Sequence, residues 1–86
     1  IVGEGDIVAQ TERVMANLQA VLTAAGVGFE HVVRAGIFLA DLKHFAQVNE
    51  IYGKAFTKDP PARSTVQVAY LPRGVLVEID MIAVGP

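Results

Sequence analysis

Two charged residues in the last third of the chain, Arg63 and Glu78, could do chemistry together. Arg63 follows two prolines at the start of a segment in which polar and apolar residues alternate. A guanidinium presents a planar fork of N–H donors that matches a carboxylate in two parallel hydrogen bonds. Glu78 lies in the most apolar segment, where an unpaired carboxylate is costly, and it could orient a water molecule or move a proton. This pair predicts a site that holds a small carboxylate.

The same residues also have structural interpretations. Arg63 could form a salt bridge with Glu78 or Asp80, and Glu78 could be a solvated residue on an exposed sheet face. Asn49 lies on the apolar side of a predicted helix, one turn before Tyr52. It is either a buried amide that satisfies backbone groups or a support for the site.

Other kinds of site have weak signals in this sequence. His31 and His44 lie far apart and have no partners at the spacing of metal ligands, and the chain contains no cysteine. There is no nucleophile elbow, phosphate-binding loop or dinucleotide-binding fingerprint. We therefore expect neither a metal nor a cofactor.

The elements that position Arg63 and Glu78 are predicted to be two strands. Residues 60–69 and 75–82 both alternate, and the sequence between them, around residues 71–74, is typical of a turn. This pattern predicts a β-hairpin. Because side chains alternate with period 2, the apolar rows should meet on one face of the sheet, with Arg63 and Glu78 together on the opposite face.

The rest of the chain predicts two helices and a further strand. Apolar residues recur at helical spacing over residues 7–25, with Asp6 as a candidate N-cap and Gly26 as a stop. Residues 32–39 are apolar and of strand length. A second helix follows Asp41 and ends before Pro60. The order helix, strand, helix, strand, strand predicts an α+β fold with both helices on one face of the sheet.

Length and composition indicate a single domain, residues 1–86, that associates with copies of itself. Hydrophobic residues make up 52% of the chain and charged residues 19%, and so short a chain cannot bury that much apolar surface alone. The formal net charge of −2 argues against a nucleic-acid partner. No apolar stretch approaches the roughly 20 residues of a membrane-spanning helix, so we expect no membrane partner.

A series of short motifs along nearly the whole chain resembles the RidA/YjgF family. The central motif is Pro61-Ala62-Arg63-Ser64, which precedes Leu71-Pro72 and then Val77-Glu78-Ile79. Further similar segments are residues 10–11, 17–18, 24–26, 38–42, 45–49 with Tyr52, and 61–66. Family members carry additional strands before the point equivalent to Ile1, so the chain is expected to lack these N-terminal strands.

The resemblance implies a chorismate-mutase-like, RidA-like fold: two helices on a mixed β-sheet, and a cytoplasmic homotrimer whose sheets form a central barrel. It also implies a site in each cleft between subunits that hydrolyses enamines and imines of the 2-iminobutanoate and 2-iminopropanoate type to 2-keto acids and ammonia, without metal or cofactor. Glu78 would be catalytic, associated with the hydrolytic water. Arg63, Thr65 and Asn49 would bind the substrate; many members have cysteine in place of Thr65.

Three other functions are compatible with parts of this pattern. The first is a protein that binds or senses keto acids or other small carboxylates without turnover. The second is RNA cleavage or inhibition of translation, as in some relatives, which the acidic net charge disfavours. The third is the chemistry of chorismate mutase, which has a similar trimeric barrel fold, but fold alone does not decide function and the motifs above do not resemble that enzyme.

Overall fold

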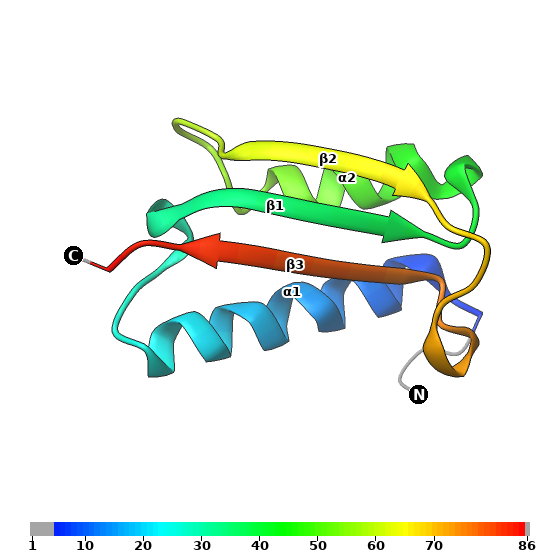
Figure 1. Ribbon diagram of the computed structural model, residues 1–86, viewed down its shortest axis with the longest axis horizontal. Helices are drawn as coiled ribbons and strands as arrows, with labels where there is room; N and C mark the ends of the chain where they lie inside the picture. The colour runs from blue at the N-terminus through cyan, green and yellow to red at the C-terminus, as the bar shows by residue number, and fades with distance from the viewer. Residues whose placement is uncertain (1–4, 86) are drawn as a thin grey trace.

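The structure of the protein, a computed structural model, describes residues 5–85. Its sheet contains β1 (Val32–Leu39), β2 (Ala62–Gln67) and β3 (Val77–Ala83), in the order β2-β1-β3. β1 pairs with β2 in parallel and with β3 antiparallel, as the arrows in Figure 1 show. The expected α+β fold with a mixed sheet is therefore confirmed.

The predicted hairpin between β2 and β3 is wrong, because β1 lies between them. β1 is the most buried strand: Ala35, Ile37 and Leu39 are at most 1% exposed. A central position buries these side chains and gives both strand edges hydrogen-bond partners. After β2 the chain passes the end of β1, where the N–H of Val68 donates to the carbonyl of Leu39 at 2.9 Å. A 3-10 turn, η3 (Pro72–Gly74), then leads into β3.

The register of the strands separates Arg63 from Glu78. Residues paired across neighbouring strands share a face, and Arg63 pairs with Ala35, whereas Glu78 pairs with Phe38. Because Ala35 and Phe38 point to opposite faces of β1, Arg63 lies on the helix-covered face and Glu78 on the open face. The expectation that Arg63 and Glu78 share one face is therefore wrong. The expectation that the apolar rows of β2 and β3 meet on one face is also wrong, because Val66 of β2 lies on the same face as Glu78.

The first helix, α1 (Ile7–Ala24), begins where the sequence predicted and ends one residue earlier. A carboxylate oxygen of Asp6 accepts from the backbone N–H of Ala9 at 3.1 Å, which satisfies one of the free donors of the helix N-terminus. Gly26 has φ of 79°, a left-handed conformation that glycine adopts without strain and that ends the helix.

The second helix, α2 (Phe45–Gly53), is shorter than predicted. Asp41 caps a preceding 3-10 turn, η2 (Leu42–His44), rather than α2 itself, and accepts from the N–H of Lys43 at 2.9 Å. A further 3-10 turn, η1 (Phe29–His31), joins α1 to β1. The chain between α2 and β2 contains Asp59 with φ of 50°, directly before the two prolines.

Both helices pack against the same face of the sheet, and the sheet lies in front of them in Figure 1. The core forms between helices and sheet because the helix-facing rows of β1 and β3 are apolar. Its buried residues are Ile7, Met15, Ala35, Ile37, Leu39, Val48, Tyr52, Val77 and Ile79. None of the helices within residues 5–85 is long and apolar enough to cross a membrane.

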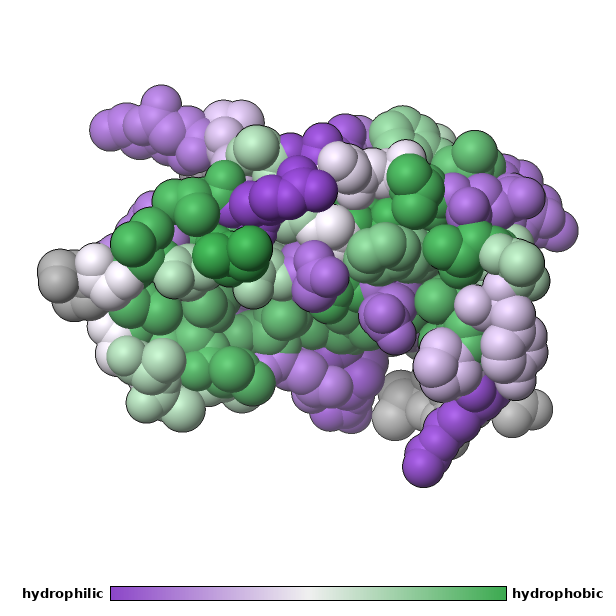
Figure 2. Space-filling view, viewed as in Figure 1, coloured by the Kyte–Doolittle hydropathy of each residue, from purple (hydrophilic) through white to green (hydrophobic). Residues whose placement is uncertain are grey.

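The opposite face of the sheet is open in this chain. Figure 2 shows it as a broad hydrophobic area with hydrophilic groups among it. Val66 is 44% exposed and Ile82 61% exposed on this face. A Cβ on Gly36 would lie 2.7 Å from Oδ1 of Asp80, so the central strand approaches the acidic side chain closely here. An exposed apolar sheet face of this kind indicates a surface for association.

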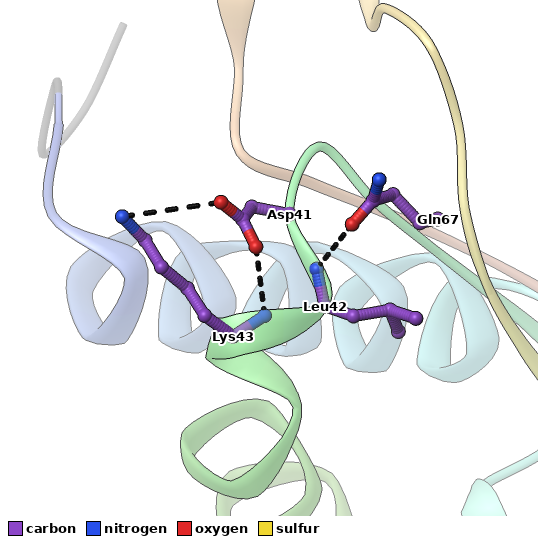
Figure 3. Close-up of polar contacts among 4 residues, drawn as sticks. All are labelled: Asp41, Leu42, Lys43 and Gln67. Atoms are coloured by element: carbon purple, nitrogen blue, oxygen red, sulfur yellow. Dashed lines mark hydrogen bonds and ion pairs between the residues drawn. The ribbon is translucent and has the colours of Figure 1, made fainter.

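The end of β2 is tied to η2 by a side chain. Oε1 of Gln67 accepts from the backbone N–H of Leu42 at 2.8 Å, beside the Asp41–Lys43 contacts (Figure 3). This bond connects the edge strand to the segment that starts α2. It therefore helps to set the position of α2 relative to β2.

We predict that Gln67→Met lowers the melting temperature by about 2–6 °C, because it leaves the Leu42 N–H without its acceptor, at a cost of about 0.5–1 kcal/mol. Thermal unfolding followed by circular dichroism measures the effect. Gln47→Met, on the exposed surface of α2, is the matched control and should shift the melting temperature little. Equal shifts for both variants would contradict the proposed tie.

Candidate functional site

Arg63 is the second residue of β2, at one edge of the sheet. The two preceding prolines restrict the approach of the chain, because each ring fixes φ near −65°. Arg63 lies on the helix-covered face, in register with the small Ala35. Its side chain is nevertheless exposed, because β2 has no further strand on its outer side among residues 5–85. The sheet edge thus carries an accessible guanidinium next to α2.

Three side chains of α2 surround this guanidinium. Nη1 of Arg63 donates a hydrogen bond to Oδ1 of Asn49. The Cζ atom of Arg63 lies 5.6 Å from the ring centroid of Phe45 and 5.4 Å from that of Tyr52, within the range of cation–π attraction. The spacing of these α2 residues, four and then three, places them on one face of the helix. α2 therefore holds Arg63 by one hydrogen bond and two aromatic rings.

No carboxylate pairs with Arg63 within the described part of the chain. The close contacts between acidic and basic side chains there join Asp41 to Lys43 and Glu30 to the imidazole of His31, and both lie at other places in the fold. The structural alternative, a salt bridge from Arg63 to Glu78 or Asp80, is excluded within one chain because both acids lie on the open face. The charge of Arg63 is thus available to an anion from outside the chain.

A cavity of about 470 Å³ opens beside Arg63. Its walls are mainly apolar, and the rings of Tyr52 and Phe56 pack with centroids 4.8 Å apart. The lining residues are Asn49, Tyr52, Gly53, Phe56, Pro60, Pro61 and Arg63. One cationic group in an apolar pocket fits a small organic anion with an apolar body.

Tyr52 contributes more than core packing to this cavity. Burial raises the pKa of Tyr52 above its ordinary value of 10.0, and the positive charge of Arg63 lowers it by a smaller amount. The phenol is therefore neutral at physiological pH and can donate a proton in a hydrogen bond. Its oxygen is buried and has no hydrogen-bond partner among residues 5–85.

Thr65 lies two residues after Arg63 on the same face of β2, in register with Ile37. Two residues along a strand correspond to about 6.6 Å, so the two side chains lie along one edge of the sheet. Oγ1 of Thr65 is buried and has no hydrogen-bond partner within the described residues. Thr65 thus lies on the same face and edge of the sheet as Arg63.

Glu78 is exposed on the open face and is not part of this arrangement. Of the four predicted site residues, the structure brings Arg63, Asn49 and Thr65 to the edge formed by β2 and α2. It separates Glu78 from them by the thickness of the sheet. A single chain therefore brings together the three residues that were predicted to bind the substrate, without Glu78.

The sequence did not predict that Phe45 and Tyr52 lie beside Arg63, because it placed both residues only in a predicted helix and in a segment similar to the family. The available signal was their spacing from Asn49, which places all three on one helical face. Asn49 itself is exposed, so the interpretation as a buried amide is wrong. Its partner is a side chain of the sheet rather than the backbone of a loop.

The histidines lie outside this site. Nδ1 of His31 accepts from the N–H of Gly28 at 3.1 Å, and His44 directly precedes α2. Within residues 5–85 there is no group of three or more histidine, cysteine or acidic side chains that could hold a metal ion. The polar side-chain groups near Arg63 are the amide of Asn49 and the hydroxyl groups of Tyr52 and Thr65.

Comparison with known proteins shows which proteins this chain is similar to in sequence and fold. The family model described as endoribonuclease L-PSP matches residues 1–85. Protein DfrA of Myxococcus xanthus is 67% identical over 82 residues, which cover 95% of this chain and 63% of that protein. The chain thus spans less than two thirds of the length of this relative.

Solved structures are similar over nearly the whole chain. RidA from the Antarctic bacterium Psychrobacter superposes with a TM-score of 0.86 at 42% identity, covering 90% of this chain and 63% of that one. The YjgF gene product of E. coli has a TM-score of 0.86 at 41% identity, covering 92% and 65%. The family match and these likenesses show that the chain belongs to the RidA/YjgF family, whose model is described as endoribonuclease L-PSP.

Proposed function

We propose that this protein hydrolyses reactive enamines and imines of the 2-iminobutanoate and 2-iminopropanoate type to 2-keto acids and ammonia. The observation that carries the proposal is the exposed Arg63 guanidinium, which has no carboxylate partner within residues 5–85 and borders an apolar cavity. A 2-imino acid carries a carboxylate and a short alkyl group, which match the charge of Arg63 and the walls of the cavity. We expect this reaction in the cytoplasm, as the family resemblance implies.

In the proposed reaction Arg63 holds the substrate carboxylate by two parallel hydrogen bonds. An enamine first takes up a proton on carbon and gives up one from nitrogen, which converts it to the imine. Water then adds to the imine carbon, and proton transfer to nitrogen gives a carbinolamine. The hydroxyl proton is then transferred to nitrogen, the C–N bond breaks, ammonia leaves, and the keto group forms. Because such imines also hydrolyse unaided, the demand on the protein is mostly one of position.

The proton-transfer role of Glu78 requires more than one chain. Arg63 and Glu78 lie on opposite faces of the sheet, so they can meet only if Glu78 comes from a neighbouring copy. A homotrimer whose open sheet faces are turned toward each other would cover Val66 and Ile82 and bring such a carboxylate into each intersubunit site. The exposed apolar residues of this face support the proposal.

Binding of small carboxylates without turnover is the second candidate function. It is favoured by the composition of the site within one chain, where Arg63 has an amide and aromatic rings as neighbours and no general base. A sensor of keto acids would need only this half of the site. Cleavage of RNA, which the name of the family model suggests, is less favoured because the chain carries a formal net charge of −2.

We predict that the protein is a homotrimer with about three times the chain mass of 9.2 kDa in light scattering. Ile82→Asp should dissociate it, because the substitution would bury an unpaired carboxylate at the interface. Val21→Asp is the matched control: Val21 is 66% exposed on α1 and should tolerate the charge. A parental protein that is a stable monomer would overturn the intersubunit site, and a trimeric Ile82→Asp variant would exclude the open face as its interface.

We predict that Glu78→Gln lowers imine hydrolysis by about a hundred-fold or more, the usual contribution of a positioned general base. Affinity for 2-ketobutanoate should change little, because Arg63 carries the binding. A dehydratase-coupled assay measures imine loss, and Glu50→Gln, an exposed acid on α2, is the control. Parental turnover in Glu78→Gln would exclude a proton-handling role. Binding without any turnover in the parental protein would favour the sensor function.

We predict that Arg63→Lys lowers the affinity for 2-ketobutanoate about ten- to a hundred-fold, because lysine loses the planar fork and one charged hydrogen bond. Titration calorimetry measures the affinity, and Arg73→Lys on the η3 turn is the control. Arg63→Ala should abolish detectable binding. Unchanged affinity with a lowered melting temperature would mean that Arg63 has only a structural role.

A further inference from the structure

We infer that Asn49 is a positioning residue that acts through Arg63: together with two aromatic rings it orients the guanidinium so that the Nε–Nη2 edge is left for the carboxylate. The inference rests on the proposed role of Arg63 as the carboxylate anchor and goes beyond it. It departs from the expectation that Asn49 binds the substrate itself.

The first observation is that only one of the three guanidinium nitrogens of Arg63 donates a hydrogen bond within residues 5–85. Nη1 donates to Oδ1 of Asn49, whereas Nε and Nη2 donate to no group within residues 5–85. A carboxylate can bind a guanidinium in parallel either end-on, through Nη1 and Nη2, or side-on, through Nε and Nη2. Because Asn49 already takes a hydrogen bond from Nη1, the side-on edge of Arg63 is the one of these two forks in which neither nitrogen has a partner within residues 5–85.

The second observation is the rigidity of the residues that hold Arg63. Phe45, Asn49 and Tyr52 all belong to α2, so their relative positions are set by one helix. This face is anchored in the core, since Val48 is 1% exposed and Tyr52 4% exposed. The guanidinium lies within cation–π range of both rings. An exposed arginine, otherwise free to adopt many rotamers, is thereby restricted before any ligand binds.

The third observation is the chemical type of the partner. Asn49 is a neutral amide, so it accepts a hydrogen bond without cancelling the charge of Arg63. A carboxylate at the same position would form an ion pair and compete with the ligand. The amide therefore combines two requirements of an anion site: a fixed guanidinium and an uncompensated charge.

The variants Asn49→Leu and Asn49→Asp test the inference in 2-ketobutanoate titrations. Asn49→Leu should weaken binding about three- to ten-fold, the value of one ordinary hydrogen bond. Asn49→Asp should weaken it by more than about ten-fold while the melting temperature stays equal or rises, because the new carboxylate pairs with Arg63. Asn17→Leu and Asn17→Asp, at an exposed position on α1, are the matched controls. In turnover assays the loss should appear in KM rather than in kcat.

A double-mutant cycle distinguishes positioning from direct contact. If Asn49 acts through Arg63, Asn49→Leu should have little further effect in an Arg63→Lys background, with the ligand titrated at millimolar concentration. If Asn49 contacts the ligand directly, the two effects should add, and the inference is overturned. Parental affinity in both Asn49→Leu and Asn49→Asp would also overturn it, while leaving the anchoring role of Arg63 intact.

A measurement without ligand separates this inference from the proposed function. Nitrogen-15 spectra of the arginine side chains, assigned with Arg63→Lys, report rotation about the Nε–Cζ bond. Arg63 should show separate Nη1 and Nη2 signals that merge in Asn49→Leu. Merged signals in the parental protein would overturn the inference whatever the activity. Separate signals that merge in the variant, together with the predicted binding changes, would support it even if no imine were hydrolysed.

Discussion

The insertion of β1 between β2 and β3 is the constraint on which the rest of the structure depends. β1 is apolar enough to need burial and neighbours on both edges, and its register with each neighbour decides which side chains of β2 and β3 share a face. Through Ile37 it assigns Thr65 and Ile79 to the core face, and through Phe38 it assigns Glu78 to the open face. The two halves of the predicted chemistry are thereby divided between the two sides of one sheet.

The electrostatics of the Arg63 site follow from this division. The nearest acids of β3 are on the other face, so the guanidinium at the sheet edge meets an amide and two aromatic rings of α2 instead. Rings attract the cation without removing its charge, and the amide occupies only one of its nitrogens. A salt bridge would have stabilised the arginine and closed it to ligands. The arrangement found leaves a positive, apolar-walled cavity suited to small carboxylates.

The central position of β1 also decides which residues lie on the open face, where copies of the chain could associate. It carries Glu78 and Asp80 among exposed apolar residues, so an interface formed there would bury acids along with hydrophobic surface. Buried carboxylates are costly unless they have partners or a task. In the proposed trimer, Glu78 has a proton-transfer role in the site of a neighbouring copy. Stability and catalysis would then depend on one interface.

The sequence by itself determined the local features: the start of α1 at its Asp6 cap, its end before Gly26, and the extent of β1. Capping, backbone strain and side-chain period are properties of neighbouring residues, so they can be read along the chain. Only the tertiary structure decided that β1 separates β2 from β3, that Glu78 faces away from Arg63, and that Asn49 pairs with Arg63. Alternation specifies that a strand has two faces, but which strand lies beside it depends on a competition between distant segments for the same edge.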